Sequence, residues 1–96
     1  KSSTDIFGIS GRKEIWITLR LSLRAYVLLR EEFPLSQPYL EKEAGEEIKS
    51  YIFNGPVLHF KGVGRFVMGL ADEITVLGPP EFKTYIKDKI KQQKLV

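Results

Sequence analysis

The chain has 96 residues, which is the length of one small domain, and its hydrophobic content of 43% and charged content of 28% are typical of a globular domain. The absence of cysteine excludes disulfides, thiolate metal sites and cysteine catalysis, and it fits a reducing, cytoplasmic environment. The net charge of +3 is too small to indicate nucleic-acid binding by itself, and no apolar run approaches the ~20 residues of a membrane span, so we expect no membrane association.

Residues 1–13, KSSTDIFGISGRK, are polar and contain two glycines, a composition that predicts a linker or arm. Ile6 and Phe7 form an apolar pair within this arm, and we expect the pair to dock on the folded domain. Since the chain starts at Lys1 without methionine, we expect a segment of a longer protein. The sequence has no basic-then-apolar stretch at its start, so we expect no secretory signal. Residues 14–96 then form the folded domain.

Residues 14–22 alternate with a period of two and predict a strand. The odd-numbered positions from Ile15 to Leu21 are aliphatic and are expected to face the core. Trp16, Thr18 and Arg20 lie on the opposite face of this strand.

Ser22 is placed to cap a helix that runs from Leu23 to about Phe33, where Pro34 ends it. Two strands follow in the prediction, at residues 37–44 and 46–53, joined as a hairpin near Gly45.

The second hairpin strand has two different faces. Ile48 and Ile52 point one way, whereas Lys49, Tyr51 and Phe53 point the other. The Asn-Gly-Pro sequence at residues 54–56 predicts a break after this strand.

The remaining residues predict a helix, a short strand and a last helix. Residues 57–71 have helical periodicity, although Gly62 and Gly64 weaken the helix by roughly 1 kcal/mol each, so we expect it to be firm only after Gly64. Residues 72–77 predict a strand, and a final helix is expected from about Pro80 to Lys94. The order is that of an α+β, ferredoxin-like βαββαβ antiparallel sheet with two helices on one face and a C-terminal helix, in which the first and third strands are central.

No group of residues predicts catalysis, so we expect neither an enzyme nor a cofactor or metal site. His59 is the single histidine and has no partner at ligand spacing. The glycine-rich GVGRF sequence at residues 62–66 lacks the strand and the Gly-Lys-Ser/Thr sequence of a phosphate-binding loop.

One group of side chains does stand out as a candidate interaction surface. With the first and third strands adjacent, the sheet face away from the helices would carry Trp16, Arg20, Lys49, Tyr51 and Phe53. Such a surface can be a protein contact, or it can stack bases and contact phosphates. It can also be covered by the terminal helix or by the arm of the same chain. The sequence leaves these alternatives open.

Three stretches resemble the C-terminal extension, or WCX domain, of bacterial transcriptional regulators that carry a WYL domain. They are IWITLRLSLRAYVLLREEFPLSQ, a strand-serine-helix unit that ends at Ser36 and Gln37; RFVMGLADEITVLGPPEFKTYIKDKI; and DIFGIS in the arm. Together they cover most of the chain outside residues 38–56. Many relatives have a histidine shortly before the Ser-Gln pair, whereas this chain has EFPLSQ.

The resemblance implies a modular parent protein. In such regulators a helix-turn-helix domain binds DNA, a WYL domain senses a ligand, and the extension contributes to dimerisation or to the response to an effector. It therefore implies a regulatory domain whose partners are the WYL and helix-turn-helix domains of its own chain and a second copy in a homodimer. DNA would be bound by the helix-turn-helix domain, and the effector would be an oligonucleotide or a small molecule. A nucleic-acid-binding or nucleotide-binding sheet that acts by base stacking is the alternative function.

Overall fold

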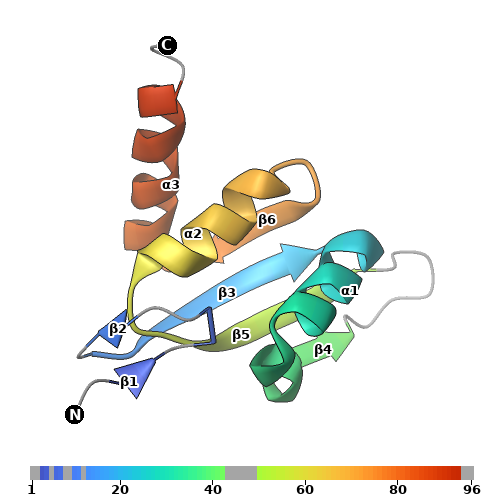
Figure 1. The fold of residues 1–96 in the computed structure, drawn as a ribbon. Coiled ribbons are helices and arrows are strands. Elements are labelled where there is room, and N and C mark those ends of the chain that lie inside the picture. Colours follow the sequence, from blue (N-terminus) through green and yellow to red (C-terminus); the bar gives the residue numbers. More distant parts are fainter. Residues whose placement is uncertain (1–2, 5, 8–9, 12, 43–49, 94–96) are drawn as a thin grey trace.

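The computed structural model describes residues 3–4, 6–7, 10–11, 13–42 and 50–93 of the chain, and it shows a mixed α+β fold (Figure 1). The elements, in chain order, are β1 (Ser3–Thr4), β2 (Ser10–Gly11), β3 (Ile15–Leu21), α1 (Leu23–Glu32), the 3₁₀ helix η1 (Pro34–Tyr39), β4 (Leu40–Lys42), β5 (Tyr51–Val57), α2 (Phe60–Gly69), β6 (Ile74–Gly78) and α3 (Pro80–Gln93).

The main sheet has four antiparallel strands in the order β4-β5-β3-β6. The predicted fold class is therefore confirmed, and the first and third strands after the arm, β3 and β5, are the central pair. Two features were not predicted: the short β1–β2 ribbon in the arm and the 3₁₀ helix between α1 and β4.

The strand-to-helix switch at Ser22 is formed as predicted. Ile17, Leu19 and Leu21 are fully buried, as a strand with one core face requires. The Ser22 hydroxyl accepts a hydrogen bond from the Ala25 backbone N–H at 3.2 Å and so caps α1.

Residues 34–39 form a 3₁₀ helix, so the predicted strand at residues 37–44 is wrong over its first three residues. Pro34 and Pro38 both lie in this helix, and their fixed backbone φ angles favour its tight turns over an extended strand. Strand β4 begins only at Leu40. The predicted hairpin tip and the start of the second hairpin strand, including Gly45, lie outside the described residues.

The predicted break at residues 54–56 is also wrong, because these residues lie inside β5. Gly55 pairs with Ile17, and a Cβ atom on Gly55 would lie only 2.8 Å from the Phe53 ring and 2.9 Å from Tyr39 Cγ. This close approach accounts for a glycine in mid-strand. Pro56 is tolerated because β4 pairs with β5 only as far as Phe53, which leaves the outer side of β5 without a strand partner at this point.

Helix α2 begins at Phe60, before both internal glycines. The exposed His59 caps it, since its Nδ1 accepts a hydrogen bond from the Lys61 backbone N–H at 3.0 Å. Gly64 is buried against α3: a Cβ atom there would lie 2.9 Å from Cε2 of Tyr85. The glycine that weakens α2 locally therefore permits close packing of α3 on it.

The core lies between the sheet and the helices α1 and α2, which are on the same side of it (Figure 1). Ala25 and Leu29 of α1 and Val63 and Val67 of α2 are buried there. Phe7 of the arm is buried in the same core, as the apolar Ile6-Phe7 pair predicts, and its ring centroid lies 4.9 Å from that of Phe33.

Candidate functional site

The sheet face that α1 and α2 do not cover is formed by alternate residues of β3 and β5. Trp16 pairs with Pro56, Thr18 with Asn54 and Arg20 with Ile52 in the antiparallel register. These six residues are called the open face below. Thr18 Oγ1 donates a hydrogen bond to Asn54 Oδ1 at 3.3 Å, which links the two central strands across it.

Trp16 is the main exposed apolar side chain of the open face. Its exposed fraction is 53%, and its ring meets Tyr39 edge-on, with centroids 5.9 Å apart and planes at 81°. A large aromatic side chain that is half exposed on a central strand is typical of a contact surface.

The expectation that this face could be covered by the chain's own elements is not met by the described residues. Helix α3 packs beside α2 rather than over the open face: Phe82 is fully buried, with its ring centroid 5.0 Å from that of Phe60 (Figure 1). Phe7 of the arm lies in the core on the other side of the sheet. Trp16 and Arg20 remain exposed.

Tyr51 and Phe53 do not belong to the open face, contrary to the prediction. Phe53 pairs with Leu19 and Tyr51 with Leu21, which places both on the core face. Phe53 is fully buried, and Tyr51 stacks on Tyr26 of α1. Lys49 lies outside the described residues. Of the three predicted aromatic residues only Trp16 is on this face.

The loss of two rings changes what the open face can do. Trp16, Pro56 and the half-buried Ile52 give it an apolar part, with Arg20 and Asn54 exposed beside them. A base-stacking surface uses several exposed aromatic rings, whereas a protein contact needs one large anchor among apolar and hydrogen-bonding groups. The geometry favours a protein contact.

The Ser-Gln pair has a structural position at the end of α1. Ser36 is fully buried, and its hydroxyl donates a hydrogen bond to the Leu29 carbonyl at 3.4 Å. The Gln37 side chain is exposed, and its backbone carbonyl accepts a hydrogen bond from the Leu40 N–H. Ser36 therefore stabilises the turn from α1 into β4.

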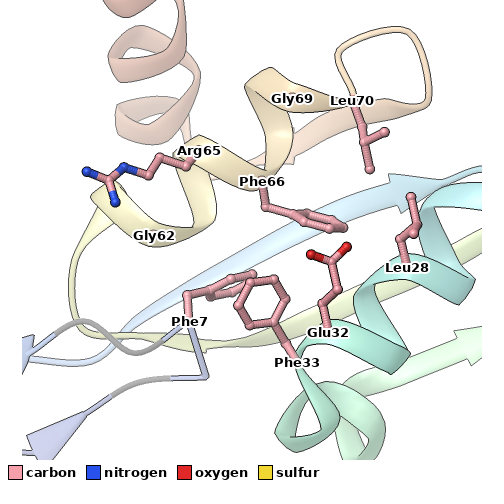
Figure 2. A pocket seen from close by; sticks show the side chains of 9 residues that line it. All are labelled: Phe7, Leu28, Glu32, Phe33, Gly62, Arg65, Phe66, Gly69 and Leu70. Carbon is pink, nitrogen blue, oxygen red and sulfur yellow. The ribbon is translucent and has the colours of Figure 1, made fainter.

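A groove between α1 and α2, on the helical side of the domain, was not predicted from the sequence. Its volume is about 400 Å³, and Figure 2 shows its lining side chains. The lining consists of Phe7, Leu28, Glu32, Phe33, Gly62, Arg65, Phe66, Gly69 and Leu70. The signal in the sequence was weak, because these residues come from three separate segments that only the tertiary fold brings together.

Within the described residues, no three or more histidine or acidic side chains are grouped as a metal site would require. None of the helices described has both the length and the apolar character to cross a bilayer.

Together these features define a small α+β domain with an exposed sheet face and a groove between two helices. A family model for the WCX domain matches residues 13–93. The chain belongs to the WCX domain family. No curated protein and no solved structure matches the chain.

Proposed function

We propose that this chain is a non-catalytic regulatory and interaction domain of a WYL-type DNA-binding transcriptional regulator, and that it acts in dimerisation or in the response to an effector. Membership of the WCX family supports the regulatory role. The observation that carries the interaction role is the half-exposed Trp16 on the open face.

The proposed partner of the open face is a second copy of the chain. Trp and Arg contribute more binding energy to protein interfaces than most other residues, and Trp16 and Arg20 lie on the same face of the central strand β3. The operator DNA is bound, in this proposal, by the helix-turn-helix domain of the parent chain. The WYL domain of the same chain is the neighbouring module.

Sedimentation of the chain over a concentration series tests the proposal, with Trp16→Ser as the test variant. We expect the unsubstituted 96-residue chain to form dimers as its concentration rises and the Trp16→Ser variant to remain monomeric. Leu35→Ser is the matched control, because Leu35 is 69% exposed but lies on η1, outside the open face. This variant should dimerise like the unsubstituted chain. Equal association of all three chains would contradict a dimer contact through the open face.

Trp16 is the single tryptophan, so its fluorescence emission distinguishes a dimer contact from the alternative function, nucleic-acid binding. A dimer contact predicts a blue shift with protein concentration and no response to a short single-stranded oligonucleotide. Quenching by the oligonucleotide at low salt, lost at high salt, would instead support nucleic-acid binding, because phosphate contacts release counterions.

A further inference from the structure

The groove between α1 and α2 has the size and lining of a small-molecule site. Its volume of about 400 Å³ lies within the roughly 300–1,000 Å³ that is usual for such sites. It lies on the helical side of the domain, away from the open face, so the two sites do not compete for the same residues.

Three phenylalanine rings form one wall of the groove. The ring centroids are 4.9 Å apart for Phe7 and Phe33, 5.9 Å for Phe33 and Phe66, and 6.2 Å for Phe7 and Phe66. Phe33 and Phe66 are only half-buried, so part of each ring remains available to a ligand. Leu28 and Leu70 extend the apolar surface (Figure 2).

The charge next to these rings is negative. Figure 2 shows the Glu32 carboxylate in the space between Phe66 and Leu28, whereas the guanidinium of Arg65 points away from the rings. Glu32 is also the last residue of α1, where the helix dipole places partial negative charge and where a carboxylate is locally unfavourable. Arg30, the basic residue of that turn, lies over the Tyr26 ring instead, 5.3 Å from its centroid.

We propose that this groove binds a small organic cation, an apolar or aromatic group that carries one ammonium. The ammonium pairs with Glu32 and with the carbonyl end of α1, and the apolar group lies on Phe33, Phe66 and Leu70. Cations are attracted to the faces of aromatic rings, which adds to the charge pairing. Such a ligand explains why Glu32 stands at the C-terminal end of α1, where the helix dipole disfavours a carboxylate.

The ligand would also contact the arm, because Phe7 is part of the same wall. This inference goes beyond the dimer contact proposed above. It concerns another face of the domain, and its test is independent of the oligomeric state.

The test is a titration of the ¹⁵N-labelled chain, followed by amide chemical shifts, with phenethylamine as the probe. Phenethyl alcohol and phenylacetate are the matched neutral and anionic probes. We expect phenethylamine to shift the amides of Leu28, Glu32, Phe66 and Leu70 and to bind more tightly than either control probe. Equal binding of the alcohol or the acid, or an absence of shifts at these four residues, would overturn the proposal.

Two variants of α1 test the role of Glu32. Glu32→Gln should weaken phenethylamine binding by at least about threefold, the strength of an exposed ion pair. Glu31→Gln makes the same change in net charge at an exposed neighbour that does not line the groove, and it should bind like the parent. Equal losses in both variants would mean a general charge effect and would also overturn the proposal. Sedimentation of the same samples reports on the dimer separately.

Discussion

Tyr26 of α1 and Tyr51 of β5 are stacked, with ring centroids 4.0 Å apart and planes within 14°. Arg30 lies over the Tyr26 ring, and its Nη1 donates a hydrogen bond to the Tyr26 hydroxyl at 3.4 Å. The stack joins the first helix to a central strand, on the core face where the register opposite Leu21 places Tyr51.

A double-mutant cycle measures this stack. Tyr26→Leu and Tyr51→Leu should each lower the free energy of unfolding. The loss in the double variant should be smaller than the sum of the two single losses by about 0.5–1.5 kcal/mol, which is the contribution of an aromatic pair beyond its buried area. Urea denaturation of the parent, the single variants and the double variant gives the coupling. Strict additivity would show that the rings contribute only by their separate burial.

Phe7→Ala should destabilise the whole domain, although Phe7 belongs to the arm. Its ring is buried among Phe33, Phe53 and Phe66, and truncation of a buried phenylalanine lowers the free energy of unfolding by about 3 kcal/mol. The midpoint of urea unfolding is the measurement. Leu35→Ala is the control and should change stability by less than about 0.5 kcal/mol, because Leu35 is 69% exposed. A Phe7→Ala midpoint close to that of the control would show that the arm does not contribute to the core.

Two glycines of the same helix should respond to alanine with opposite signs. In Gly64→Ala the new Cβ lies 2.9 Å from Cε2 of Tyr85, so the Tyr85 ring or the whole of α3 must shift. Because Tyr85 is packed between α2 and α3, we expect a loss of about 1–2 kcal/mol despite the better helix propensity. In Gly69→Ala the new Cβ meets nothing within 4 Å, so we expect a gain of about 0.5 kcal/mol. Thermal unfolding of both variants tests the pair, and a stabilised Gly64→Ala would show that Tyr85 moves aside easily.

Ser22→Ala should remove two interactions at once. The Ser22 hydroxyl caps α1, and it donates a hydrogen bond to Glu73 Oε1 at 2.6 Å. The Ser22 backbone N–H, which the substitution retains, donates to the Glu73 carbonyl at 3.0 Å. We expect a loss of about 1–2 kcal/mol in the free energy of unfolding, measured by urea denaturation. Ser22→Asp retains a cap acceptor but sets a carboxylate against Glu73. It should not recover full stability, and a full recovery would mean that the contact with Glu73 contributes nothing.

The unit from Ile15 to Glu32 could be predicted closely because its periodicity changes from two to helical at a capping serine. Which face of β5 points to the core could not be predicted, since both sets of alternate residues in this strand contain apolar side chains near Tyr51. The row that faces the core continues to Gly55 and Val57, both buried, but the prediction ended the strand before them. Had the strand been extended through residues 54–56, the other row, Ile52 to Pro56, would have been the more polar one.

The groove could not be predicted for a different reason. Phe7, Phe33 and Phe66 lie far apart in the chain, and each follows local rules that say nothing about the others. Phe33 ends a helix and Phe66 lies in the middle of one. Their meeting depends on how α1 and α2 pack on the sheet, which periodicity does not determine.

Pro56 has a consequence for how two copies can meet. It keeps its place opposite Trp16 while the pairing with β3 continues on both sides, so its missing N–H belongs to the outer edge of β5. An incoming strand would find no donor at that position, which discourages extension of the sheet by edge-to-edge pairing along this part of β5. In the proposed dimer, contact through the open face around Trp16 is therefore favoured over edge pairing on this side. Such a contact would close on two copies instead of growing into an open array.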